Sequence, residues 1–181
     1  MTSRPRHMLI PLALAAALFA LGAAAPMKKG ADAAKIKRGE YLATVMGCGD
    51  CHTPGMLFGQ PDVSRALSGS ELGWQGPWGV SYPRNLTPDP ETGLGKWTEA
   101  QIVTAIRTGV RPDKRILNPP MPWQDFSKLT DADAHALAAY LMSLPPVKHQ
   151  APDLVPPGKK VEGSIIVMPP PPAWDVPAAA K

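Results

Sequence analysis

The sequence predicts an all-α domain with three or more helices and long loops, followed by an extended, proline-rich C-terminal tail. Three stretches carry apolar residues at helical spacing, at residues 32–47, 98–108 and 130–144. Residues 53–96 are rich in glycine and proline, and a loop of that length in a compact domain usually is functional or wraps around another group. Ten of the 23 prolines lie in residues 145–181, so that segment is extended rather than helical.

Length and composition restrict the class of protein. A chain of 181 residues corresponds to one domain, and 44% hydrophobic residues suffice for a packed core. The net charge of +4 is small and does not favour a nucleic-acid partner, which requires a clustered basic patch. Two cysteines are too few for a disulfide-rich scaffold.

Residues 1–25 have the composition of a secretory signal peptide. Arg4 and Arg6 precede an uncharged stretch, residues 8–25, that ends in small residues. The alternative is an uncleaved anchor, since eighteen uncharged residues lie at the lower limit of a membrane span. Both interpretations export the domain, which predicts a periplasmic location. An anchor, or membership of a membrane complex, would add association with the membrane.

The first predicted helix, residues 32–47, has one apolar side and a glycine stop. Ile36, Leu42 and Met46 recur at helical spacing on that side. Gly47 and Gly49 then interrupt the pattern, so the helix ends directly before the two cysteines.

The second and third predicted helices both begin at a threonine cap. Thr98 and Gln101 have the spacing of a capping box. Thr130 can cap the third helix, whose first turn is acidic as the helix dipole favours. The apolar stripes of the two helices are Ile102, Ala105, Ile106 and Gly109, and Leu137, Tyr140, Leu141 and Leu144.

The sequence divides into residues 1–25, a domain over residues 26–149 and a tail over residues 150–181. Ile165, Ile166 and Val167 in the tail form a short strand or pack on the core. The tail as a whole, which also carries Trp174, either docks on a partner or is an unstructured extension.

Residues 48–52 carry the chemistry, because they read Cys-Gly-Asp-Cys-His, the motif for covalent attachment of haem c. Cys48 and Cys51 are nearly one helical turn apart, so both thiols can reach one edge of a porphyrin and form thioethers. His52 follows directly and can bind the iron as the proximal ligand. One motif predicts one covalently bound haem.

Two other uses of a Cys-x-x-Cys pair are less consistent with this sequence. A zinc site needs two further ligands at suitable spacing, and the chain has no second cysteine pair. A thioredoxin-like dithiol needs a βαβ pattern around it, whereas the pattern here is helices and loops.

Met121 is the best candidate for the second axial ligand. It lies in Asn118-Pro-Pro-Met-Pro-Trp123, an irregular loop between the second and third helices, where the prolines restrict the backbone. The ordinary alternative for any methionine is core packing. Ligation by His52 and Met121 would fill both axial positions and raise the reduction potential.

These residues resemble the class I c-type cytochromes, and in particular the monohaem domains of cytochrome c subunits of periplasmic alcohol and aldehyde dehydrogenases. The resemblance covers residues 34–147. It rests on the haem motif and on Arg38–Leu42, Asn85–Trp97, Ala105–Gly109, Met121–Trp123 and Leu129–Pro146.

The resemblance implies the cytochrome c fold, with the first and last helices crossing where Gly39 approaches Tyr140. It implies His52 and Met121 as iron ligands, and Cys48 and Cys51 as haem attachment sites. It also implies that Arg84, Asn85 and Trp97 meet the haem propionates. The alternatives are surface positions for Arg84 and Asn85, and a packing role for Trp97.

The predicted function is electron transfer without catalysis of its own. The chain would be a periplasmic monohaem cytochrome that carries single electrons, free or as a subunit of a respiratory or dehydrogenase complex. Its redox partners would be a dehydrogenase, a cytochrome complex or a terminal oxidase. Two alternatives remain, namely a haem enzyme or gas sensor with an open iron site, and a tethering subunit that acts through its tail.

Overall fold

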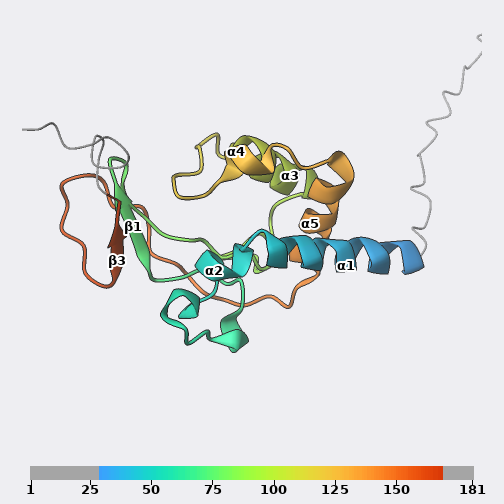
Figure 1. Ribbon diagram of the computed structural model, residues 1–181, viewed down its shortest axis with the longest axis horizontal. Coiled ribbons are helices and arrows are strands. Elements are labelled where there is room, and N and C mark those ends of the chain that lie inside the picture. Colours follow the sequence, from blue (N-terminus) through green and yellow to red (C-terminus); the bar gives the residue numbers. More distant parts are fainter. Residues whose placement is uncertain (1–28, 169–181) are drawn as a thin grey trace, which may run out of the picture.

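The protein structure, a computed structural model, describes residues 29–168. The segment 1–25 and Trp174 lie outside these residues. Five α-helices form the frame: α1 Lys29–Val45, α2 Cys48–His52, α3 Glu99–Thr108, α4 Trp123–Phe126 and α5 Asp131–Ser143 (Figure 1). Short 3₁₀ turns follow α2 at Met56–Phe58 and Val63–Arg65. In the described part of the chain, every helix is too short or too polar to span a membrane.

The three longest helices confirm the predicted ones to within three residues at each end. The α3 cap is the predicted capping box, in which the Gln101 N–H donates to Thr98 Oγ1 and the Thr98 N–H donates to Gln101 Oε1. Thr130 Oγ1 likewise accepts a hydrogen bond from the Asp133 N–H at the start of α5. These side chains satisfy backbone donors that the first helical turn leaves unpaired.

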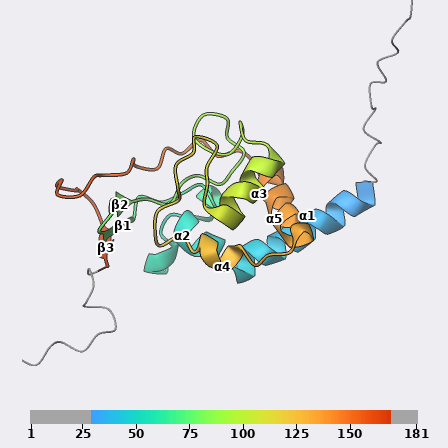
Figure 2. The same ribbon diagram turned by 90° about the horizontal axis from the view of Figure 1, so that it is seen from above.

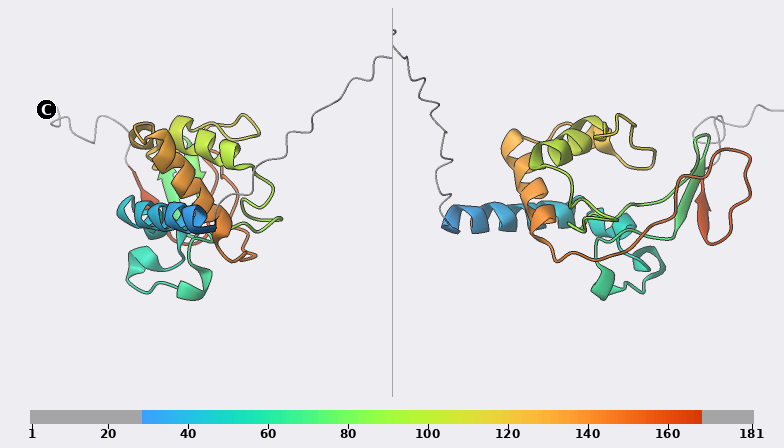
Figure 3. Two further views of the ribbon diagram at one scale, coloured as in Figure 1. Left: turned by 90° about the vertical axis from the view of Figure 1, so that its right-hand side faces the viewer. Right: turned by 180° about the vertical axis from the view of Figure 1, so that it is seen from behind.

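Helices α1 and α5 cross in close contact, as Figure 3 shows from behind the view of Figure 1. A Cβ on Gly39 would lie 2.0 Å from the carbonyl oxygen of Ala136 and 2.6 Å from Cβ of Tyr140. Only glycine permits this approach, because any side chain would overlap the backbone of α5. The crossing that the resemblance implied is therefore present.

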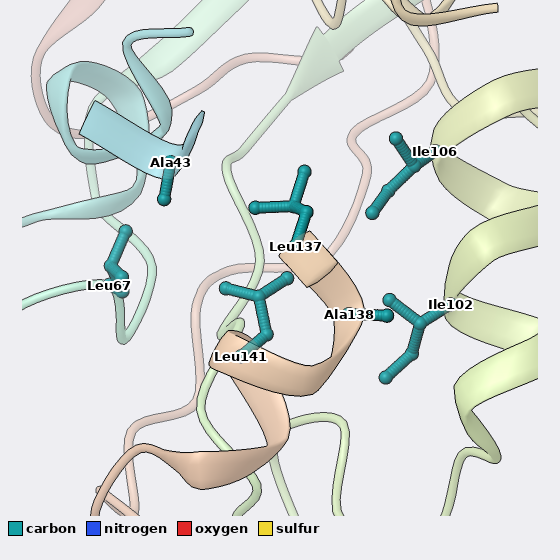
Figure 4. Packing of buried hydrophobic residues seen from close by; sticks show 7 residues of the cluster. All are labelled: Ala43, Leu67, Ile102, Ile106, Leu137, Ala138 and Leu141. Carbon is teal, nitrogen blue, oxygen red and sulfur yellow. The ribbon is translucent and has the colours of Figure 1, made fainter. Parts of the chain in front are cut away.

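The core lies on both sides of α5 (Figure 4). Leu137, Ala138 and Leu141 of α5 face α3 on one side and α1 with the following loop on the other. Their buried partners are Ile102, Ile106, Ala43 and Leu67. Burial of these side chains fixes the three long helices around the segment that carries the cysteines.

A small sheet departs from the all-α prediction. Strands β1 Gly73–Gly76 and β2 Gly79–Ser81 form an antiparallel hairpin, and β3 Ile165–Val167 pairs parallel to β1, giving the order β2-β1-β3. Strands β1 and β2 are only four and three residues long and lie in glycine- and proline-rich sequence, where no alternation is long enough to predict them. Of the two predicted roles for Ile165–Val167, the structure shows the strand.

The described part of the proline-rich tail packs on the domain itself. Residues 147–168 run from the end of α5 back to the hairpin (Figure 1). Val155 exchanges two backbone hydrogen bonds with Val80, of 2.8 and 3.0 Å, and Ala151 is buried. This part of the tail is therefore not an unstructured extension.

Candidate haem-binding site

The Cys-x-x-Cys-His motif forms one short helix of its own. Gly47, in the left-handed conformation with φ of +67°, separates α2 from α1 and turns the chain. Cys48 and Cys51 are half-buried free thiols, three positions apart on α2, so they lie on the same side of the helix. His52 is the last residue of α2.

His52 is held in one orientation by a backbone carbonyl. Its Nδ1 lies 2.6 Å from the carbonyl oxygen of Arg84. Because a carbonyl only accepts, Nδ1 carries the hydrogen and the Nε2 lone pair is left for another ligand. Burial lowers the pKa of His52, against the opposing effect of the bond to Arg84, so the imidazole is neutral at physiological pH.

The two thiols have raised pKa values, unlike the thiols of a reactive dithiol. Burial raises the pKa of Cys48 to about 11, and the neighbouring Asp50 and Cys51 add to this effect. Burial and Asp50 also raise the pKa of Cys51. Cysteines in dithiol redox motifs have lowered pKa values, which keep the thiolate available. The electrostatics therefore disfavour the dithiol interpretation.

The side chain of Arg84 is bound to the C-terminal segment. Its Nη1 donates to the carbonyl oxygens of Ala151 and Pro152 at 2.8 and 2.7 Å. Its Nη2 pairs with Asp153 Oδ1 at 2.7 Å. The predicted contact of Arg84 with a propionate stays a prediction, and the contacts that the structure shows are with protein groups.

Asn85 is buried, and its amide also binds protein groups. Its Nδ2 donates to the carbonyl oxygen of Val147 at 2.7 Å and to Thr92 Oγ1 at 3.0 Å. Its Oδ1 accepts from the N–H and the hydroxyl of Thr87. Trp97 packs at the edge of the core, which matches the alternative predicted for it. The propionate role of these two residues stays a prediction.

Met121 is half-buried in the loop that joins α3 to α4. In Figures 1 and 2 this loop lies over α2, on the side of α1 where α3 and α4 are found. Its course is fixed by a hydrogen bond of 2.8 Å from the Leu117 N–H to the Gly109 carbonyl. A second, also of 2.8 Å, runs from Ser81 Oγ in the hairpin to the Pro119 carbonyl. Ligation by Met121 stays a prediction.

Two buried N–H donors in the described residues have no acceptor within the protein, Nε1 of Trp74 and Nε of Arg111. Buried donors are almost always paired, so an unpaired one indicates an acceptor outside the protein, either an ordered water or a bound group. Haem carries two propionate carboxylates, which are acceptors of this kind. Sequence spacing could not have found these residues, because their common property appears only after folding.

The charges around Arg111 favour an anion. Burial lowers the pKa of the Arg111 guanidinium, Asp113 opposes this, and Arg115 and Arg84 lower it further. Asp113 Oδ2 is 3.3 Å from Arg111 Nη2 and is shared with Arg115. Three guanidinium groups thus lie near one another, and a carboxylate there would offset the cost of burying Arg111.

These residues fit a covalently bound haem c. Two thiols on one turn of helix can form its thioethers, and a neutral imidazole offers its Nε2 to the iron. Two buried N–H donors without a protein acceptor can bind its carboxylates. A helical domain with this arrangement is that of a c-type haem protein. The chain belongs to the cytochrome c family, whose family model, Cytochrome c, matches residues 36–145.

Similar proteins include cytochrome subunits of dehydrogenases. The chain is 40% identical over 146 residues to the cytochrome c subunit of the quinone alcohol dehydrogenase of Gluconobacter oxydans (strain 621H), covering 79% of this chain and 29% of that subunit. It is 37% identical over 129 residues to the cytochrome c subunit of the gluconate 2-dehydrogenase of Pantoea cypripedii, covering 71% of this chain and 27% of that subunit.

A third relative is the fructose dehydrogenase cytochrome subunit of Gluconobacter japonicus, 36% identical over 118 residues, or 65% of this chain and 23% of the subunit. The chain thus spans less than a third of the length of each of these three relatives. The family, its haem and its role in electron transport agree with the sequence analysis.

Proposed function

We propose that this chain is a monohaem electron carrier of the periplasm, which accepts and passes on single electrons. The observation that carries the proposal is the geometry of His52. The bond of its Nδ1 to the Arg84 carbonyl leaves Nε2 free, directly after two cysteines that can hold the porphyrin. When bound, the haem supplies reversible one-electron chemistry, and the protein sets its potential.

We propose Met121 as the ligand opposite His52. Support comes from its half-buried position in a loop that lies over α2 and is tied to the hairpin by Ser81. A filled second axial position would exclude small molecules from the iron. Electron transfer without substrate binding is the function that this arrangement favours.

Trp74 and Arg111 are the residues that we assign to the propionates. Their unpaired donors and the surrounding guanidinium groups support this role. Compensation of the propionate charge would stabilise the reduced state, because the ferric haem carries one more positive charge and gains more from a nearby anion.

The partner that we propose is a dehydrogenase, with a second redox protein as the acceptor. The names of the relatives support this, since they include cytochrome subunits of alcohol, fructose and gluconate dehydrogenases. The periplasmic location rests on residues 1–25, and cell fractionation with a C-terminal tag would test it. Recovery of the haem-loaded protein in the cytoplasm would contradict it.

The test of the proposed function is the optical spectrum of the reduced holoprotein before and after addition of carbon monoxide. An unchanged spectrum is expected, since Met121 would occupy the sixth position. Met121→Ala should bind carbon monoxide readily, whereas Met142→Ala, on the exposed side of α5, should behave like the wild type. A haem–carbon monoxide spectrum in the wild type would instead support a haem enzyme or gas sensor.

A further inference from the structure

The carbonyl that orients His52 belongs to a residue whose side chain is bound elsewhere. Arg84 accepts the His52 Nδ1–H at 2.6 Å through its backbone. Its guanidinium makes three hydrogen bonds of 2.7–2.8 Å to Ala151, Pro152 and Asp153. One residue therefore connects the proximal face of the haem site to the C-terminal segment.

We call residues 147–155 the C-terminal strap. It is attached to the segment around Arg84 at several points, and each attachment is a specific hydrogen bond. Asn85, next to Arg84, donates to the Val147 carbonyl at 2.7 Å. The N–H of His149 donates to Thr92 Oγ1 at 3.1 Å, and its ring Nδ1 lies 2.8 Å from the Ser68 carbonyl.

The backbone on the other side of Arg84 is fixed as well. The Pro83 carbonyl accepts from the Ser70 N–H at 3.1 Å, and the His52 carbonyl accepts from the Gly69 N–H at 2.8 Å. The loop around Ser70 therefore joins the backbones of His52 and Pro83. How far the Arg84 carbonyl can still move therefore depends on the contacts of the Arg84 side chain and of Asn85. The strap binds both residues.

We propose that the C-terminal strap, through Arg84, positions the carbonyl that orients His52 and thereby sets the reduction potential of the haem. The inference rests on the proposed role of His52 as an iron ligand. A well-placed carbonyl makes the imidazole a stronger electron donor, which favours the ferric state and lowers the potential. Arg84 is then a positioning residue, and the strap is part of the haem site.

Arginine suits this role better than other cations. Its planar group offers several donors in fixed directions, so it can bind two adjacent carbonyls and a carboxylate at once. Asp153 is 86% exposed, whereas Ala151 is buried, so the guanidinium spans the edge between solvent and the interior. Lysine would keep the charge but lose the simultaneous contacts.

The first experiment measures hydrogen exchange of the His52 Nδ1–H by NMR in the reduced, diamagnetic holoprotein. Arg84→Gln should accelerate this exchange by about tenfold or more, because charge-assisted bonds that restrain the carbonyl are lost. Arg84→Lys should give an intermediate acceleration. Arg107→Gln, which removes a guanidinium paired with Asp131 between α3 and α5, is the matched control and should leave the exchange unchanged.

The second experiment is a double-mutant cycle of Arg84→Gln and Asp153→Asn. The double variant has the same net charge as the wild type, so a change in its potential reports the hydrogen bonds rather than a lost charge. Its potential should be higher than that of the wild type. Its exchange should be no faster than that of Arg84→Gln alone, because both changes break the same attachment.

Unchanged exchange in Arg84→Gln would overturn the inference. The inference would also be overturned if Arg84→Gln shifted the potential, Asp153→Asn did not, and neither variant changed the exchange of the His52 Nδ1–H. That result would assign Arg84 to a propionate. If Arg84→Gln fails to incorporate haem, Asp153→Asn alone still tests the strap, with a smaller acceleration expected. The carbon monoxide test of the wild type is independent of these variants, so failure of the Met121 assignment would be recognised separately.

Discussion

The Ser81 hydroxyl joins the hairpin to the loop of the proposed methionine ligand. Its Oγ donates to the Pro119 carbonyl at 2.8 Å and accepts from Nε1 of Trp78 at 3.2 Å. The sheet that the sequence did not predict thus supports the Met121 loop from one side. No motif in the sequence marks Ser81, because its partner is known only once the hairpin and the loop are folded.

Ser81→Ala should loosen the Met121 loop. We expect a loss of about 0.5–1.5 kcal/mol in the free energy of unfolding, the usual contribution of one hydrogen bond. Carbon monoxide should bind to the reduced variant faster than to the wild type. Ser143→Ala removes a comparable bond to the Tyr140 carbonyl at the end of α5 and should not change carbon monoxide binding. Equal binding rates in the two variants would show that Ser81 does not restrain the loop.

Trp74→Phe removes one N–H from the proposed propionate site and keeps the aromatic ring. The propionate charge would then be less compensated, so the ferric state would gain and the potential would fall, by up to about 60 mV for 1.4 kcal/mol. Redox titration of the holoprotein measures the change. Trp78→Phe is the control, because its Nε1 is already paired with Trp74 and Ser81 inside the protein. A similar fall in both variants would argue against the assignment.

Single residues of the site differ in how far the sequence predicts them. Cys48, Cys51 and His52 follow from local chemistry, because attachment needs two thiols and an imidazole within one turn. Trp74 and Arg111 can be identified only in the folded chain, where each has a buried N–H without an acceptor in the protein. Arg84 shows a third case, since its resemblance-based role and its observed contacts differ.

For the helices, local sequence signals predict where a helix begins and ends better than they predict which elements it packs against. The threonine caps of α3 and α5 and the glycine after α1 lie where the sequence places them. Helices α2 and α4 are too short for an apolar period to reveal them. Strands β1 and β2 form a local hairpin that is too short to show an alternating pattern, and β3 depends on pairing with a segment about 90 residues away in the sequence, which a local pattern does not contain.

Gly39→Ala should force α1 away from α5. The added methyl group would lie 2.0 Å from the Ala136 carbonyl, and backbone cannot rotate away as a flexible side chain can. We expect a loss of about 1–3 kcal/mol in the free energy of unfolding, the usual cost of overpacking. Urea unfolding of the holoprotein measures it. Lys37→Ala, on the exposed face of α1, should stay within about 0.5 kcal/mol of the wild type.

Across the whole molecule, ion pairs connect elements that are distant in sequence. Glu99 of α3 accepts hydrogen bonds from Lys35 of α1 and His135 of α5. Burial alone would raise the pKa of Glu99, but these two partners outweigh it and lower the pKa. Arg38 in the same way lowers the pKa of Asp133, which links α1 to α5.

The stability of the holoprotein should therefore fall in acid. A carboxylate with a lowered pKa stabilises the fold above its unfolded pKa and loses that contribution as pH falls through the folded value. Asp62 is the most strongly shifted of these carboxylates, because its bonds to Ser64 and Arg65 lower its pKa to about 2. The melting temperature should decline from about pH 4.5 to about pH 2.

Glu99→Gln tests this pH dependence at one position. The variant should be less stable than the wild type at pH 6, where Glu99 is ionised, and the difference should shrink toward pH 2. Calorimetric melting temperatures at matched ionic strength measure it. A difference that is the same at both pH values would show that the ionised Glu99 does not contribute.

The crossing of α1 and α5 has a consequence for the order of events during biogenesis. Ribosomes make the first helix and the two cysteines well before the last helix exists, so the domain cannot close until α5 has emerged. Once closed, it half-buries Cys48 and holds that thiol protonated. We therefore expect thioether formation while the exported chain is still open, before α5 packs against α1 and encloses a haem that is already attached.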